Sequence, residues 1–295
     1  MIGSICGDIV GSVFEFDNIK STEFELFSEK SVFTDDTVLT VATMDVLLNG
    51  GSYAEVYRKW FRRYPDASFG QRFYKWGFGD SMEPYNSWGN GSAMRVSPIG
   101  LWHKDMEATR AEAKASAAAT HNHPEGIKGA EATAAAVFLA RTGANKETIR
   151  DYVTSEFGYN LTESVDSIRT WYKYDISCQG TVPPAVICFL ESTDFEDSIR
   201  RAISIGGDSD TIACITGGIA EAFYGIPAEI KEQTMARLPQ DMRSIIEQFY
   251  SCIEENRFIM SNPKNYNHLL ESKAEIDAGK VIKKEWKELE DLATK

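Results

Sequence analysis

The sequence has 295 residues and a formal net charge of −13, with 43% hydrophobic and 25% charged residues. This composition is typical of a globular protein and excludes a disordered chain. The acidic balance argues against a general nucleic-acid binder, because phosphate binding needs clustered Lys and Arg. The net charge does not exclude a local basic groove.

No apolar run approaches the roughly 20 residues of a membrane span. The first residues lack the basic region of a secretory signal. The five cysteines are scattered and form no CxxC pair, which indicates reduced thiols rather than a disulfide framework or a thiolate zinc site. We therefore expect a cytoplasmic protein with no membrane partner.

Glycines spaced four residues apart stand near the start of the chain. On a helix, Gly3, Gly7 and Gly11 form a smooth stripe that allows close packing. Asp8 and Glu15 are two helical turns apart, so we expect them to share one face of that helix. Packing accounts for the glycines but does not explain a carboxylate on that helix.

Helical periodicity dominates the rest of the chain. The segment 125–141 is apolar nearly all round, which predicts a buried central helix. No alternating strand pattern and no βαβ spacing is present, so we expect an all-α fold. The other expected helices cover residues 36–48, 107–120, 194–205, 210–224, 241–257 and 275–292.

The region 52–88 has no clear period and holds 11 aromatic residues between Tyr57 and Trp88. We interpret it as an irregular, loop-rich cap packed by its own rings. A stacking surface for a base is the alternative. The charged tail beyond 271 predicts a solvated amphipathic helix with no chemistry of its own.

Two segments have the same design, with paired carboxylates and hydroxyls at a helix start. They are Thr34-Asp35-Asp36-Thr37 and Gly206-Gly207-Asp208-Ser209-Asp210-Thr211. Capping alone explains one acid at a helix N-terminus but not two adjacent ones, which repel each other. Together the segments offer four carboxylates and threonine hydroxyls, a donor set suited to Mg²⁺ or Mn²⁺ and not to zinc.

Two further segments carry candidate binding groups. The small-residue loop 89–95 can offer backbone N–H groups to a phosphate, with a plain tight turn as the alternative. It lacks the GxGxxG pattern and a preceding strand, which excludes a dinucleotide fold. The segment 120–124 holds two of the four histidines and is either a helix break or a hydrogen-bonding wall of an active site.

As a set, these segments resemble the ADP-ribosylglycohydrolase family, whose founding type is the dinitrogenase-reductase-activating glycohydrolase. The five matching pieces occur in family order. They are GDIVGSVFE (Gly7–Glu15), FTDDT (Phe33–Thr37), GNGSAMRVSPIGL (Gly89–Leu101), THNHPEGIKGA (Thr120–Ala130) and GGDSDTIACITGGIAEAFYG (Gly206–Gly225).

The resemblance implies a compact, all-α orthogonal helical bundle with a centre of two Mg²⁺ or Mn²⁺ ions. The catalytic domain would cover residues 1–260, followed by a charged helical extension over 261–295. The implied metal ligands are Thr34, Asp35, Asp36, Asp208, Asp210 and Thr211. The implied catalytic residues are Glu15, Asp35 and Asp36. The implied substrate-binding residues are Asn90, Gly91, Ser92, Met94, Arg95 and His121.

The activity implied is hydrolysis of the bond between C1″ of ADP-ribose and an acceptor, which reverses ADP-ribosylation of a protein or a small molecule, by a monomer. Some arginine-specific relatives carry an acid shortly before the GNG loop, where this chain has Tyr85-Asn86-Ser87-Trp88. The linkage therefore stays open among arginine, serine, a base and O-acetyl ADP-ribose. Glu221 replaces a common family glycine, and we expect it on the helix surface.

Two other functions remain open. Carboxylates with Mg²⁺ also serve two-metal phosphoesterases, which would release AMP rather than ADP-ribose. A non-catalytic ADP-ribose binder or immunity protein is the third reading. Such degenerate members are expected to lose metal-motif acids, whereas all four aspartates are present here, which favours catalysis.

Overall fold

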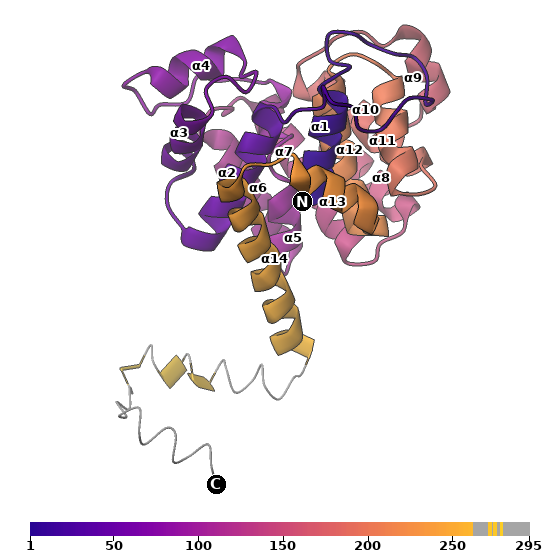
Figure 1. Cartoon of the computed structure of the whole chain (residues 1–295). Coiled ribbons are helices and arrows are strands. Elements are labelled where there is room, and N and C mark those ends of the chain that lie inside the picture. Colours follow the sequence, from indigo (N-terminus) through magenta and orange to yellow (C-terminus); the bar gives the residue numbers. More distant parts are fainter. Residues whose placement is uncertain (262–270, 273, 276–277, 280–295) are drawn as a thin grey trace. The chain divides into compact units, whose positions relative to one another are not determined.

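The computed structural model describes residues 1–261, 271–272, 274–275 and 278–279. Over these residues the chain is helical and forms no strand, as expected (Figure 1). The expected helix 275–292 and the extension 261–295 lie largely outside them. The helices are α1 (Ile2–Gly11), α2 (Asp35–Asn49), α3 (Tyr53–Arg63), α4 (Gln71–Phe78), α5 (Ser97–Trp102), α6 (Met106–Ala118), α7 (Pro124–Arg141), α8 (Lys146–Phe157), α9 (Val165–Trp171), α10 (Cys178–Glu191), α11 (Phe195–Ser204), α12 (Ser209–Tyr224), α13 (Ala228–Ala236) and α14 (Gln240–Ser261), with a 3₁₀ turn at Asn90–Ser92.

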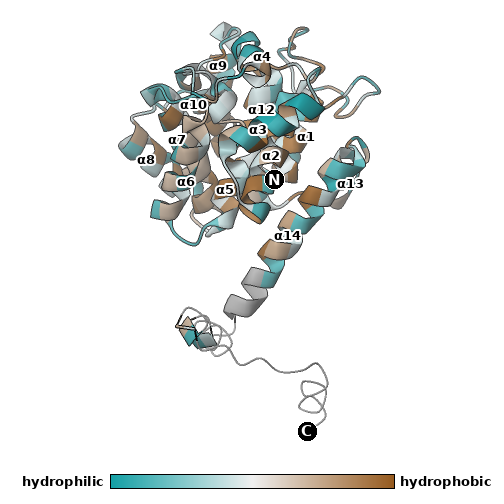
Figure 2. Ribbon diagram, turned by 90° about the vertical axis from the view of Figure 1, so that its left-hand side faces the viewer, coloured by the Kyte–Doolittle hydropathy of each residue, from teal (hydrophilic) through white to brown (hydrophobic). Residues whose placement is uncertain are grey.

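The chain divides into two units, Met1–Phe249 and Tyr250–Lys295. The first holds every candidate site residue. Its hydrophobic helices, such as α1 and α5, contrast with the more hydrophilic α3 in Figure 2. The expected central helix is confirmed as α7, which is largely buried and packs on α5, α6, α10 and α12. Among the described helices, none combines the length and apolar character that a bilayer crossing requires.

The expectation of an irregular segment over 52–88 was wrong, because α3 and α4 form there. Four aromatic residues of α3, at helical spacing, are buried on one face: Tyr53, Tyr57, Trp60 and Phe61. The rings do pack on one another, since Phe61 makes edge contacts at 4.9 Å with both Phe69 and Phe78. The dense aromatic composition concealed a helical period.

Helix α10 was not predicted, and it contains two consecutive prolines, Pro183 and Pro184. A proline has no N–H, so Pro184 leaves the carbonyl of Gly180 without its helical partner. The hydroxyl of Tyr172 donates to that carbonyl at 2.9 Å. A side chain therefore replaces the missing backbone hydrogen bond.

Among the described helices, α1 and α12 make the most extensive contact. A Cβ atom added at Gly7 would lie 2.0 Å from the carbonyl oxygen of Ala213, and one at Gly3 would lie 2.3 Å from that of Gly217. At Gly11 it would lie 2.4 Å from the Cα of Asp210. The predicted glycine stripe is thus confirmed, and it allows the two backbones to touch.

The outer end of this helix pair holds a polar contact. Glu221, near the end of α12, accepts a hydrogen bond at 2.6 Å from the backbone N–H of Gly3. Glu221 is half-buried at the surface of α12, and it also accepts from an otherwise unpaired N–H of the first turn of α1, a role that the expected surface position did not include.

Asp8 joins α1 to the start of α2. Its buried carboxylate accepts hydrogen bonds from the backbone N–H groups of Thr34 (2.9 Å) and Thr37 (3.0 Å), and from both threonine hydroxyls. Four donors satisfy the carboxylate and fix the first turn of α2. This explains the carboxylate that packing alone did not.

We expect Gly7→Ala to reduce the free energy of unfolding by about 2 kcal/mol or more, because the added methyl forces α1 away from α12. Urea denaturation followed by circular dichroism measures this loss. Gly70→Ala is the matched control, since nothing lies within 4 Å of its added Cβ. Equal stability of the two variants would contradict the backbone contact.

We expect Asp8→Asn to cost roughly 1–3 kcal/mol, because the amide nitrogen cannot accept hydrogen bonds from buried donors. The free energy of unfolding from urea titration is the measurement. Asp17→Asn, at an exposed position, is the control and should be nearly neutral. If both substitutions are neutral, Asp8 does not hold the start of α2.

Candidate active site

A cavity of about 340 Å³ lies where the N-termini of α2 and α12 meet the loop after α1 and the 3₁₀ turn at Asn90–Ser92. The N-terminal end of α4 closes another part of its wall. The cavity combines carboxylates, aromatic rings and two arginines. Its principal lining residues are Glu15, Asp35, Asp36, Arg72, Tyr85, Asn90, Gly91, Met94, Arg95, His121, Tyr174, Asp208, Asp210 and Thr211.

The two acidic segments, remote in sequence, meet at this cavity. The hydroxyl of Thr211 donates to Asp36 Oδ1 at 3.3 Å across a separation of 175 residues. The hydroxyl of Thr34 lies 3.5 Å from Asp210 Oδ2, although it is bound more closely by Asp8. The convergence follows from the fold, because Asp8 fixes α2 to α1 and the glycine stripe fixes α12 to α1.

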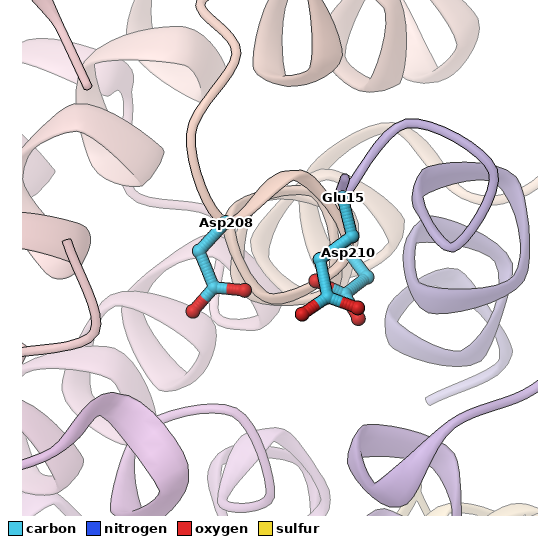
Figure 3. A group of neighbouring side chains, drawn as sticks. All are labelled: Glu15, Asp208 and Asp210. Atoms are coloured by element: carbon cyan, nitrogen blue, oxygen red, sulfur yellow. The ribbon is translucent and has the colours of Figure 1, made fainter. Parts of the chain in front are cut away.

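Among the described residues, Glu15, Asp208 and Asp210 form a close acidic group, with one oxygen of each carboxylate within 4.8 Å of the others. Glu15 comes from the loop after α1, and both aspartates come from the start of α12 (Figure 3). The expectation that Asp8 and Glu15 share a helix face was wrong, because α1 ends at Gly11. The chain then turns and brings Glu15 back over the N-terminus of α12.

Burial and neighbouring negative charge raise the pKa values of these acids. The pKa of Glu15 is raised to about 7, first by burial and then by Asp208. The same causes raise the pKa values of Asp35, Asp36 and Asp210 well above the ordinary range. A cation bound among them would remove this repulsion.

The side chain of Asp36 shows whether a cation would fit among these acids. Its Oδ1 accepts from Thr211, whereas its buried Oδ2 has no hydrogen-bond partner in the described part of the chain. An unpaired buried carboxylate oxygen is costly and calls for an ion or a water. The donor set of carboxylate and hydroxyl oxygens suits a hard divalent cation.

The GNG loop lies beside the acids, but much of its hydrogen bonding is internal. The N–H of Asn90 donates to Ile176 O at 2.8 Å, and its side-chain amide donates to Asp208 at 2.6 Å and Thr181 at 3.0 Å. The hydroxyl of Ser92 is fully buried and donates to Gly126 O at 2.7 Å. Asn90 therefore orients Asp208, and Ser92 holds the loop to α7 rather than lining the cavity.

Arg95 and His121 line the same cavity as the acids. The fully buried guanidinium of Arg95 packs 4.3 Å from the ring centroid of Tyr57 and donates to Thr120 at 2.9 Å. Its Nε and Nη1 have no partner among the described residues. Burial, followed by Arg95 and then Arg72, lowers the pKa of His121 well below its ordinary value, so the imidazole is neutral near pH 7.

Sequence reasoning missed several lining residues, among them Arg72, Tyr85 and Tyr174. The hydroxyl of Tyr174 donates to Glu15 Oε1 at 3.1 Å, and its ring stacks on that of Phe16. Arg72 packs over the ring of Tyr85 at 5.0 Å. These residues lie in segments without a motif, and only the local density of aromatic residues signalled them.

A family model for ADP-ribosylglycohydrolases matches residues 1–259. ADP-ribosylarginine hydrolase Tri1 of Pseudomonas putida (strain GB-1) is 26% identical over 266 residues, covering 77% of this chain and 70% of the relative. Human ADP-ribosylhydrolase ARH3 is 26% identical over 306 residues, covering 77% of this chain and 84% of the relative. A solved structure titled ADP-ribosylglycohydrolase-related protein complex has the same fold, with a TM-score of 0.65 and 23% identity over 85% of this chain and 95% of that chain. The chain therefore belongs to the ADP-ribosylglycohydrolase family.

Proposed function

We propose that this chain is a hydrolase that cleaves the glycosidic bond between C1″ of ADP-ribose and an acceptor, and so reverses ADP-ribosylation. The observation that carries the proposal is the meeting of the acids of α2 and α12 with Glu15 in one cavity. The names of the relatives, an ADP-ribosylarginine hydrolase and an ADP-ribosylhydrolase, support this substrate class.

We propose that two Mg²⁺ or Mn²⁺ ions bind in the cavity. The unpaired Oδ2 of Asp36 and the raised pKa values of the clustered acids support a cation there. When bound, divalent ions supply positive charge that orients sugar hydroxyls and lowers the pKa of water. The proposed ligands are Thr34, Asp35, Asp36, Asp208, Asp210 and Thr211.

Glu15 is the proposed proton carrier. Glycosidic cleavage passes through an oxocarbenium-like state, which needs an acid at the leaving atom and a base for water. Burial raises the pKa of Glu15 and favours its protonated form, whereas cations bound beside it would favour the carboxylate, so both the acid and the base role are open to Glu15. The hydroxyl of Tyr174 orients the carboxylate for that transfer.

The wall formed by Gly91, Met94, Arg95 and His121 is the proposed seat of ADP-ribose. The unpaired nitrogens of Arg95 offer charge-assisted donors, and His121 has its Nε2 left for a ligand, because its Nδ1 lies 2.7 Å from the hydroxyl of Thr120. A substrate panel of ADP-ribosylated arginine, serine, base and O-acetyl compounds, with Mg²⁺ and with chelator, identifies the acceptor. Release of AMP instead of ADP-ribose would favour a phosphoesterase, and metal-independent binding without turnover would favour a binder.

We expect Asp210→Asn and Asp35→Asn each to lower kcat by about 100-fold or more and to weaken Mn²⁺ binding, because each removes a carboxylate from the proposed site. Release of ADP-ribose and isothermal titration with Mn²⁺ measure the two effects. Asp166→Asn, with a side chain 86% exposed, is the control and should change neither. Full activity of either site variant in chelator would reject the metal-dependent mechanism.

We expect the metal-free protein to lose stability as the pH rises from about 5 to about 8, since Glu15 holds its proton up to about pH 7 in the folded state but releases it near ~4.3 when unfolded. Asp35, Asp36 and Asp210 act in the same direction. Excess Mg²⁺ should therefore raise Tm by about 5 °C at the upper pH and by much less at the lower one, because protons compete for the carboxylates. Differential scanning fluorimetry at both pH values measures this, and an equal Mg²⁺ effect at both would count against a cation among these acids.

A further inference from the structure

The side chain of Asn18 connects the loop that carries Glu15 to the turn that precedes Asp208. Its Oδ1 accepts from the N–H of Gly207 at 2.7 Å, and its Nδ2 lies 2.9 Å from the carbonyl oxygen of the same residue. Nδ2 also lies 2.6 Å from Phe14 O and 3.1 Å from Glu15 O. One amide thus contacts both backbone segments that present the close acidic group.

Only a primary amide suits this position. It must accept at one atom and donate at the other, and a carboxylate of the same shape would face three carbonyl oxygens without a proton to offer. Gly207 has a positive φ of 79°, and a Cβ there would lie 2.4 Å from Tyr172 Cε1. Gly207 is therefore held between the Tyr172 ring on one side and the Asn18 amide on the other.

The rest of the loop has anchors of its own. The Arg200 guanidinium donates to Phe24 O at 2.7 Å and to Thr22 O at 3.1 Å. The Lys20 ammonium donates to Tyr172 O at 3.0 Å and to Ile205 O. Loss of the Asn18 amide therefore leaves residues 20–24 attached. The part that bears Glu15 keeps two longer contacts, from the Ser209 hydroxyl to Phe14 O at 3.3 Å and from the Tyr174 hydroxyl to Glu15 Oε1 at 3.1 Å.

We propose that Asn18 is a positioning residue, which fixes Glu15 relative to Asp208 and Asp210 through its four contacts to Phe14, Glu15 and Gly207. The inference rests on the proposed function for its catalytic consequence, but not for its structural one. Because Asn18 is exposed, its removal leaves no cavity in the core, and the effect falls on the geometry of the acids rather than on folding.

The test uses the full chain with Asn18→Ala and Asn18→Asp, and with Asp17→Ala as the control at the neighbouring exposed position. Both Asn18 variants should bind Mn²⁺ about 10-fold or more weakly in isothermal titration without substrate. Both should lower kcat by about 10- to 100-fold with KM nearly unchanged. Thermal unfolding should stay close to that of the parent, and Asp17→Ala should match the parent throughout.

A double-mutant cycle separates positioning from a general structural effect. In a Glu15→Gln background, measured at saturating Mn²⁺, Asn18→Ala should lower kcat by much less than it does in the parent, because the part of its effect that runs through Glu15 is already lost. A full additional loss in that background would overturn the proposal. So would unchanged Mn²⁺ affinity in both Asn18 variants.

Hydrogen exchange does not depend on catalysis, so it tests the positioning role of Asn18 separately from the proposed hydrolase function. Hydrogen exchange of the amide of Gly207 and of residues 12–18 should accelerate in Asn18→Ala and not in Asp17→Ala. If no ADP-ribosylated substrate is cleaved, yet exchange accelerates and Mn²⁺ affinity falls, the proposed function fails and the positioning role stands. Unchanged exchange and affinity in an active enzyme would overturn the positioning role alone.

Discussion

The contact of two helix backbones, α1 against α12, is the constraint on which the rest of the molecule depends. Side chains at Gly3, Gly7 and Gly11 would drive the helices apart, and the start of α12 would then move away from the loop after α1. Close backbone contact also limits sliding, because each glycine faces a particular carbonyl or Cα. The position of the aspartates at the start of α12 therefore depends on Gly3, Gly7 and Gly11, which have no side chain.

Asp8 extends this constraint to a third helix. Its four hydrogen bonds fix the first turn of α2 to α1. The acids of α2 and the acids of α12 are therefore both positioned relative to α1. The fold thus brings together carboxylates that repel one another, at a cost in free energy for the metal-free chain. Such an arrangement is expected where charge is matched by a ligand rather than by the protein itself.

The sequence indicated the helical fold and the acidic segments, because helical period and paired acids are local signals. It also indicated the glycine stripe, whose spacing of four has a direct packing consequence. It did not reveal α3, where aromatic residues hid the period, or α10, where Pro183 and Pro184 argued against a helix. The position of Glu15 depended on where α1 ends, and the glycine at that end, Gly11, also belongs to the four-residue packing stripe, so its role as a helix end was not apparent.

The prolines of α10 have a consequence beyond their own helix. Because Pro184 has no hydrogen to give, the carbonyl of Gly180 is left for the hydroxyl of Tyr172, and this holds the phenol ring against Gly207. An ordinary residue at Pro184 would supply that hydrogen and compete with the tyrosine for the same oxygen. The shape of the turn formed by Gly206 and Gly207, just before Asp208, thus depends on the missing N–H of Pro184 in α10.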